Sequence, residues 1–427
     1  MLDIKLFREN PQIIKDNLVK KFQEHKIPWV DEVVELDLKL RQLKQEIDDL
    51  RSQRNKKSKE IGLLMAKKEF DLANQIKNEV TSIGENISIK ENEIDPVQTK
   101  IKELMMNIPN IIDDSVPIGK DDSENVEIYK VGNIFERDFD IPHHVEIMES
   151  LAGIDLDSAR KTSGSGFYYL MGDVARLHSA ILSYARDFMI NNGFVYVIPP
   201  FMIHKNVVEG VMSFDEMENM MYKIEGEDLY LIGTSEHSMI GKYIDTIIKQ
   251  SDLPHLLTSY SPCFRKEVGA HGIEERGVYR IHQFEKQEMI VICSPQQSMD
   301  YFEKMYKLSV ALFESMMIPV RVIECCSGDL ADLKVKSVDI EAYSPRQKKY
   351  FEVCSCSNLG DAQSRRLMIR VDNNGEKYYP HTLNNTVVAP PRMLIAYLEN
   401  NLNVDGSISI VPALQPYMGG QKAILKK

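Results

Sequence analysis

The 427-residue sequence lacks the features that mark membrane, secreted and zinc-binding proteins. It has no run of about eighteen apolar residues, and the segment Met1 to Lys5 lacks the apolar stretch of a signal peptide. We therefore expect neither a signal peptide nor a membrane span. The protein is expected to be cytoplasmic. The six cysteines form neither a disulfide framework nor a paired C-x-x-C zinc pattern. We interpret them as reduced thiols, with a metal site as the less favoured alternative.

Positive charges are fewer than negative charges overall, but one segment concentrates them. The formal net charge of −12 argues against a surface that binds nucleic acid everywhere. Between Arg51 and Lys68, however, seven Lys and Arg residues face a single acid, Glu60. A basic patch on an acidic protein would focus a polyanion onto one place. The length predicts two domains, or one large α/β unit with an appendage.

Two heptad seams near the N-terminus predict an antiparallel helical hairpin. In each, seam residues recur at alternating steps of four and three, the spacing of a coiled coil. The first seam comprises Leu36, Leu40, Leu43, Ile47, Leu50, Arg54, Lys57, Ile61 and Leu64, and the second Ala73, Ile76, Val80, Ile83, Ile87, Lys90, Ile94, Val97, Ile101 and Leu104. The turn is expected at residues 66–71, and each arm would be about 50 Å long.

Polar residues and one proline modify this hairpin. Arg54 and Lys57 occupy seam positions where a stable coil would have Leu or Ile, so basic character gathers near the turn. A solvated coil face would explain a basic run. We favour nucleic-acid contact, because the run lies on an arm with almost no compensating acid. Pro96 removes a backbone donor inside the second seam and predicts a kink or a helix break.

Beyond residue 107 the pattern changes to a linker and then to mixed elements. Turn signals at 108–110 and 117–122 place a domain boundary near residue 110. Strands are expected at 195–198, 229–232, 289–292 and 320–323, and helices at 177–190 and 299–316. The pattern predicts an α+β fold with a largely antiparallel sheet and helices outside it.

The region from Cys263 to Glu288 carries the densest set of binding side chains. If 263–267 and 280–288 are strands of one hairpin, alternation places Arg265 and Glu267 on one face. On the second strand, the same rule places five side chains on one face: Arg280, His282, Phe284, Lys286 and Glu288. Guanidinium groups suit phosphates, an aromatic ring suits a base, and carboxylates suit ammonium or amide donors. The mixture indicates a nucleotide site.

These segments, in this order, resemble the seryl-tRNA synthetases, a family of class II aminoacyl-tRNA synthetases, over essentially the whole chain. The matches are the opening Met1-Leu2-Asp3, the hairpin, the linker Ile108-Pro109-Asn110, motif 1 (about 185–200), Thr234-Ser235-Glu236, motif 2 (about 262–290), Glu352 to Asn358 and motif 3 (about 382–400). Each string alone would be a weak signal. Together, at matching spacing, they are strongly specific.

The resemblance implies a fold and a reaction. The implied fold is a class II synthetase-type antiparallel sheet with flanking helices, plus an N-terminal antiparallel coiled-coil hairpin. Residues 1–110 would bind tRNA and residues 111–427 would form the catalytic domain. Serine and ATP would give seryl-adenylate and diphosphate, and the seryl group would pass to the 3′ end of tRNA(Ser), releasing AMP. Charging of tRNA(Sec) depends on the host. Motif 1 implies a homodimer.

The resemblance also implies roles for individual residues. Arg265 and Arg392 would be catalytic. ATP would be bound by Arg265, Lys266, Glu267, Ile281, Phe284, Glu352, Val353, Cys354, Ser355 and Arg392. Serine would be bound by Thr234, Ser235, Glu236, Arg265, Glu288 and Thr386. Mg²⁺ would be held by Glu352 and Ser355, and the tRNA by Arg51, Arg54, Lys56, Lys57 and Lys59. His282 is interpreted as structural, because the carboxylate of serine is already ionised and needs no base.

A few positions depart from the family pattern. Pro390 and Pro391 precede Arg392 where small residues are usual, but proline costs little in the first turn of a helix. Gly166 stands where the family commonly has Arg, and Cys354 where Ser is common. These departures leave the implied function intact.

Two other functions fit parts of the sequence. One is a ligase that passes a small amino acid to a carrier protein, but such paralogues typically lack the helical arm. The other is a non-catalytic scaffold with a decayed site. The retained charged residues Arg265, Glu288 and Arg392 argue against that scaffold.

Overall fold

The computed structural model describes residues 1–135, 137–267 and 277–427. Part of the predicted motif 2, residues 268–276, therefore lies outside the described residues. The chain separates into two units, Leu2–Pro109 and Asn110–Lys427, with Met1 joined to the second. The separation falls at the linker expected near residue 110, and the roles assigned to the two parts stay predictions.

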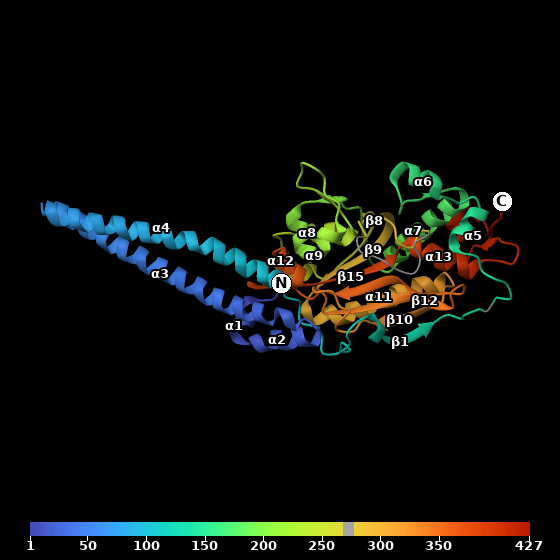
Figure 1. Ribbon diagram of the computed structural model, residues 1–427, viewed down its shortest axis with the longest axis horizontal. Helices are drawn as coiled ribbons and strands as arrows, with labels where there is room; N and C mark the ends of the chain where they lie inside the picture. The colour runs from blue at the N-terminus through green and yellow to red at the C-terminus, as the bar shows by residue number, and fades with distance from the viewer. Residues whose placement is uncertain (136, 268–276) are drawn as a thin grey trace. The chain divides into compact units, whose positions relative to one another are not determined.

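The first unit is helical. Its helices are α1 (Ile4–Glu9), α2 (Pro11–Lys20), α3 (Ile27–Ala66) and α4 (Phe70–Asn107). The two long helices lie side by side (Figure 1). Every predicted seam residue is buried or half-buried, including the polar Arg54, Lys57 and Lys90. The antiparallel coiled-coil hairpin is therefore confirmed, with its turn between α3 and α4.

The helix break expected at Pro96 is wrong, because α4 continues through that residue. Pro96 is exposed, and so is Asn92, whose carbonyl loses its helical partner four residues later. Water can hydrate that carbonyl, which removes most of the cost of the missing donor.

One buried carboxylate ties α1 to α3. Asp37 accepts hydrogen bonds from Arg8 Nη2 at 2.7 Å and Arg41 Nε at 3.0 Å. The Arg8 guanidinium is the main cause that lowers the pKa of Asp37. A buried charge is tolerated here because two cations compensate it.

The second unit is built on a sheet whose strand order is β1-β10-β11-β12-β15-β9-β8-β4. The strands are β1 (Val126–Val131), β4 (Val195–Val197), β8 (His255–Phe264), β9 (Gln283–Cys293), β10 (Val320–Glu324), β11 (Lys336–Ser344), β12 (Lys349–Asn358) and β15 (His381–Val388). Neighbours pair antiparallel except β4 and β8, which are parallel. The predicted α+β fold with a largely antiparallel sheet is confirmed.

Smaller elements surround this sheet. Within the described residues, short strands form one small sheet of three strands and three pairs. The three-stranded sheet comprises β14 (Glu376–Tyr378), β13 (Arg370–Asn373) and β7 (Ile247–Lys249). The pairs are β16 (Ile408–Ser409) with β17 (Ala423–Ile424), β2 (Ile154–Asp155) with β3 (Tyr169–Leu170), and β5 (Met202–Ile203) with β6 (Tyr230–Leu231). The helices are α5 (His144–Ser150), α6 (Leu156–Ser163), α7 (Gly172–Asn191), α8 (Lys205–Val211), α9 (Phe214–Met220), α10 (Ser235–Gly241), α11 (Ser298–Ser315), α12 (Ala362–Arg366) and α13 (Pro390–Asn401).

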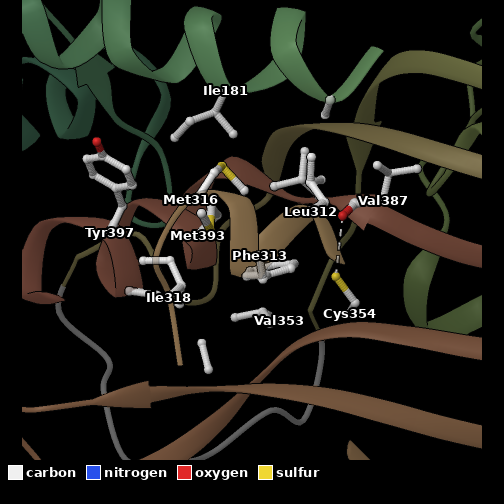
Figure 2. Packing of buried hydrophobic residues seen from close by; sticks show 14 of the residues in the cluster. Ile181, Leu312, Phe313, Met316, Ile318, Val353, Cys354, Val387, Met393 and Tyr397 are labelled. Carbon is white, nitrogen blue, oxygen red and sulfur yellow. Dashed lines mark hydrogen bonds between the residues drawn. The ribbon is translucent and has the colours of Figure 1, made fainter. Parts of the chain in front are cut away.

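The main core lies where α7, α11 and α13 pack on the sheet. Figure 2 shows Phe313 of α11 surrounded by residues of the other elements, among them Ile181 of α7, Val353 of β12 and Met393 of α13. Tyr397 is among the largest fully buried side chains. This core supports the strands β9, β12 and β15, which carry the candidate site.

The strand hairpin predicted at 263–288 needs one correction. β8 and β9 pair antiparallel, but β8 ends at Phe264 and β9 begins at Gln283. Arg280 and His282 therefore lie before β9 and do not share the alternating face of that strand. The His282 N–H instead donates to the Gly166 carbonyl at 2.9 Å. On the other side, Glu267 has φ of 49°, which ends the extended conformation.

Candidate active site

A cavity of about 510 Å³ opens at the ends of β8 and β9 and along β12 and β15. Most of the predicted site residues line it: Thr234, Glu236, Arg265, Glu267, Ile281, Phe284, Glu288, Glu352, Val353, Cys354, Ser355, Thr386 and Arg392. These residues come from segments more than one hundred positions apart. The fold therefore gathers both predicted catalytic arginines, the aromatic ring and the carboxylates around one space.

Alternation along β9 builds one wall. Phe284, Lys286 and Glu288 occupy every second position and all line the cavity. The Arg265 guanidinium carbon lies 5.3 Å from the centroid of the Phe284 ring, and Arg265 Nε donates to the Gly233 carbonyl at 3.1 Å. Arg265 is thus held in place by a ring and a carbonyl.

The other arginine is oriented by an acid and a ring. Arg392 Nη1 donates to Glu352 Oε2 at 2.9 Å, and its guanidinium carbon lies 4.7 Å from the Tyr279 ring centroid. Pro390 and Pro391 occupy the first turn of α13, after Ala389. No helical hydrogen bond is lost there, so the unusual prolines still place Arg392 in the cavity.

The amino-acid end of the cavity holds two carboxylates. Glu236 Oε1 accepts from Gln363 Nε2 at 2.7 Å, and burial, followed by the nearby Glu288, raises the pKa of Glu236. Thr234 caps α10, because its hydroxyl accepts from the Glu236 N–H at 3.4 Å. The Thr386 hydroxyl lies 3.5 Å from Glu288 Oε2. This end therefore offers anionic oxygens and hydroxyl groups.

A bulge in β12 brings Glu352 and Ser355 to the same face. Residues three positions apart normally point to opposite faces of a strand. In the pairing with β11, however, Glu341 faces Glu352 and Ile340 faces Cys354, so Val353 is the extra residue. Across from Ser355, Asp339 has its pKa raised to about 6 by burial and then by Glu352. Carboxylate and hydroxyl oxygens in this arrangement suit a hard divalent cation.

Two predicted ATP-binding residues at the bulge line the cavity although their side chains belong to the core. Val353 and Cys354 are 3% and 2% exposed and belong to the core shown in Figure 2, where the Cys354 thiol lies 3.7 Å from the Val387 carbonyl. A ligand would meet mainly their backbone. The replacement of the usual Ser by Cys354 therefore leaves the cavity chemistry unchanged.

Two predicted residues do not line the cavity. The Lys266 N–H donates to the Met220 carbonyl at 2.9 Å, and its side chain is not part of the cavity wall. Ser235 is fully buried at the start of α10 and is not part of the cavity wall. Contact of either residue with a ligand stays a prediction.

The departure at Gly166 has a local physical reason. Gly166 has φ of +79°, and a Cβ atom there would lie 2.6 Å from His282 Cδ2. The His282 ring also lies 5.3 Å from the Phe167 ring, and its Nδ1 is 3.1 Å from the Arg265 carbonyl. His282 thus supports the backbone of Arg265, as its structural interpretation required.

The cavity has further residues that the sequence reasoning did not select as ligand-binding. They are Tyr279, Lys286, His237 and Asn384, among others. Lys286 was visible in the alternation of β9, whereas Tyr279 precedes the strand and gave no signal. Burial, with Arg265 and Lys286 nearby, lowers the pKa of His237 to about 3, so this ring is neutral at ordinary pH.

The predicted tRNA-binding cations of α3 fall into two groups. Arg51 and Lys57 form ion pairs across the hairpin, with Glu91 at 2.8 Å and Glu79 at 2.5 Å. Within the described residues, Arg54, Lys56 and Lys59 form no ion pair. Lys56 and Lys59 are exposed. The three unpaired cations are the better candidates for phosphate contacts.

The cysteines are all free and buried. Cys325 has possible metal-ligand atoms of Asp329 and Asp339 within 4.8 Å, but burial strongly raises the pKa of its thiol. A protonated thiol is a poor metal ligand. Among the described residues, no helix combines the length and apolar composition needed to cross a membrane.

Comparison with protein families gives two matches. Residues 1–112 match the model of the seryl-tRNA synthetase N-terminal domain. Residues 220–401 match the class II core domain of the tRNA synthetases for G, H, P, S and T. The two matches cover the helical unit and most of the cavity.

Individual relatives are similar in sequence to this chain over nearly its full length. The serine–tRNA ligase of Methanoculleus marisnigri is 40% identical over 427 residues, covering 99% of this chain and all of that protein. The one from Thermococcus onnurineus is 40% identical, with 98% and 96% covered.

Solved structures agree as well. Seryl-tRNA synthetase from Pyrococcus horikoshii, complexed with ATP, superposes with a TM-score of 0.94 at 39% identity and covers both chains fully. Cytoplasmic serine–tRNA ligase from Naegleria fowleri, in complex with AMP, gives a TM-score of 0.90 at 32% identity, with 100% and 99% covered.

Proposed function

The chain belongs to the seryl-tRNA synthetase family, and from this premise we propose how its residues divide the work. It is an ATP-dependent ligase that activates serine and charges tRNA. We propose that the specific substrate is tRNA(Ser), with tRNA(Sec) as a second substrate where the host makes one. The observation that supports the proposal best is the single cavity shared by Arg265, Phe284, Glu288 and Arg392.

Arg265 and Arg392 bind the triphosphate. Arg265 holds the α-phosphate, and Arg392 reaches the γ-phosphate and covers the adenine from the side opposite Phe284. The positions of Arg265 beside Phe284 and of Arg392 over Tyr279 support this arrangement, because both guanidinium groups are already oriented. Glu267 and the backbone near Ile281 and Val353 complete the nucleotide site. Preorganised cations stabilise the charge that develops during transfer.

Serine binds at the opposite end of the cavity. Its ammonium and hydroxyl groups are satisfied by Thr234, Glu236, Glu288 and Thr386, and its carboxylate lies beside Arg265. The raised pKa of Glu236 supports this role, since a buried carboxylate whose hydrogen-bond partner is the neutral Gln363 gains from an incoming ammonium. Alanine is rejected because it would leave these buried polar groups unpaired.

Glu352 and Ser355 are the residues that would hold Mg²⁺. Their oxygen donors share one face of β12 as a result of the bulge, and hard cations prefer such ligands. When bound, the metal neutralises phosphate charge and helps to keep the triphosphate bent. Glu352 is paired with Arg392 in this structure, so it must exchange that partner when the nucleotide enters.

The reaction needs no covalent intermediate on the protein. The carboxylate of serine attacks the α-phosphorus, diphosphate leaves, and Arg265 stabilises the charge on the α-phosphate oxygens. The terminal ribose hydroxyl of tRNA then attacks the acyl carbon and AMP leaves. Buried His237 is neutral and already close to Arg265, so it takes no part as a cation.

The helical arm and motif 1 have separate roles. We propose that Arg51, Arg54, Lys56, Lys57 and Lys59 contact the tRNA backbone, which an RNA helix presents as phosphates and shape rather than readable bases. The edge strand β4 leaves Val195 and neighbouring Ile198 61% and 68% exposed, which supports a homodimer formed through motif 1. We also propose a cytoplasmic location, which the charging reaction and the free cysteines support.

Exchange of radiolabelled diphosphate into ATP tests the first step. Serine alone among the amino acids should support exchange, and Glu236→Ala should abolish most of it. Addition of total tRNA should then yield seryl-tRNA. Exchange without tRNA charging would favour the carrier-protein ligase, and no exchange with any amino acid would favour the scaffold.

A further inference from the structure

Lys286 is a cavity residue whose charge the proposed roles leave unused. Its side chain lines the cavity between Phe284 and Glu288, yet it is only 6% exposed. Lys286 Nζ lies 2.5 Å from Glu288 Oε2, and Glu288 is 2% exposed. Burying an ammonium group is costly unless a carboxylate compensates it at close range. The two residues therefore form one unit at the amino-acid end.

The ion pair makes the surroundings of Glu288 different from those of Glu236. Glu288 Oε2 is occupied by Lys286 and lies near the Thr386 hydroxyl, whereas Glu288 Oε1 accepts no hydrogen bond from the described residues. Glu236 has Gln363, a neutral donor, as its close partner. Lys286 thus pairs directly with one of two neighbouring acids, whereas Glu236 forms no ion pair within the described residues.

We propose that Lys286 is a specificity-determining positioning residue that acts through Glu288. The Lys286 ammonium group holds the Glu288 carboxylate so that one carboxylate oxygen faces the substrate hydroxyl. The same ammonium group compensates the negative charge of Glu288. Glu288 then serves as a neutralised hydroxyl acceptor, and Glu236 remains the acid that attracts the substrate ammonium. The inference rests on the proposed serine pocket and adds a residue that itself need not touch serine.

The test is the Lys286→Met variant in diphosphate exchange with serine and with alanine. Without the ammonium group, Glu288 loses its fixed orientation and competes with Glu236 for the substrate ammonium. We expect the KM for serine to rise about tenfold to hundredfold, as for loss of a charged hydrogen bond. The preference for serine over alanine should fall by a similar factor, with the KM for ATP within about twofold of wild type. Lys307→Met, an exposed lysine of α11 paired with Glu303, is the matched control and should change none of these values.

Three outcomes decide the matter. Unchanged serine KM and unchanged preference in Lys286→Met would overturn the inference, and so would an equal loss of ATP and serine affinity. If Lys286→Met does not fold, Glu288→Gln and the double variant Lys286→Met/Glu288→Gln replace it. A residue acting only through Glu288 predicts the same serine KM in both, whereas multiplied effects would overturn the inference. Failure of the wild-type protein to activate serine would instead count against the proposed function.

Discussion

The cavity and the helical arm use the same charged residue types in opposite ways. In the cavity, Lys286 and Glu288 lie 2.5 Å apart and have side chains only 7% and 2% exposed. On the arm, Arg51 and Glu91 are 50% and 43% exposed. Buried pairs fix geometry and are costly to break, whereas exposed pairs contribute little individually. Removal of one charged residue from the cavity should therefore change activity measurably. On the arm, several charged residues must be removed together to give a measurable effect.

The largest effect should come from a single cavity residue. Arg392→Ala should lower serine-dependent diphosphate exchange about 10²–10³-fold, because it removes a preorganised cation from the transferring phosphates. Arg160→Ala, whose side chain is 68% exposed on α6, should leave exchange unchanged. A loss below threefold in Arg392→Ala would erase the contrast between cavity and arm.

A smaller effect is expected when three arm charges are removed together. Arg54→Ala/Lys56→Ala/Lys59→Ala should lower kcat/KM for aminoacylation roughly tenfold and flatten its salt dependence, because phosphate contacts release counterions. Serine-dependent exchange should stay at the wild-type rate. The matched double variant Arg51→Ala/Lys57→Ala, which removes cations already paired with acids, should have a weaker effect. Equal loss of exchange and aminoacylation would remove the arm from tRNA binding.

The apolar seam of the arm should determine its stability. Ile87→Ala should destabilise the hairpin by about 2–5 kcal/mol, because Ile87 is 4% exposed and its removal leaves a cavity. Ile89→Ala, on the same helix but 60% exposed, is the matched control. Thermal unfolding followed by circular dichroism should separate the two variants, while exchange stays normal at low temperature. Similar melting of both would show that the seam does not stabilise the arm.

The smallest effect is expected at the back of the cavity. Cys354→Ser should change stability by at most about 1 kcal/mol and leave the KM for ATP unchanged, because a hydroxyl keeps a donor near the Val387 carbonyl. Its neighbour Ser355→Ala, on the cavity face, should raise that KM. If both variants alter ATP affinity equally, the assignment of the two faces of β12 is wrong.

Local periodicity explains why the arm could be predicted from the sequence. The seam residues of α3 and α4 were identified from heptad spacing alone, since a coiled coil repeats one local rule. At Pro96 the same rule was insufficient, because the cost of a proline depends on whether water reaches the freed carbonyl. Most of the residues that the family resemblance selected for ATP and serine line one cavity, although the role of each stays a prediction.

The remaining features of the site depend on contacts between distant segments. The strand expected at 280–282 is absent, and the His282 N–H donates to Gly166, more than one hundred residues earlier. The shared face of Glu352 and Ser355 depends on a bulge that simple alternation would not reveal. Lys286 was visible in the pattern, but its ion pair with Glu288 gave it a meaning only once burial was known.

Because of the extra residue in β12, one short segment of the strand contributes side chains both to the hydrophobic core and to the solvent-accessible cavity. Val353 and Cys354 are successive side chains that both close the hydrophobic interior, while Glu352 and Ser355 on either side of them remain in contact with solvent. A strictly alternating strand would expose one apolar side chain and bury one polar side chain instead. Deleting a single residue here would therefore reverse inside and outside for everything on one side of the deletion, so this short segment should tolerate substitutions far better than changes in length.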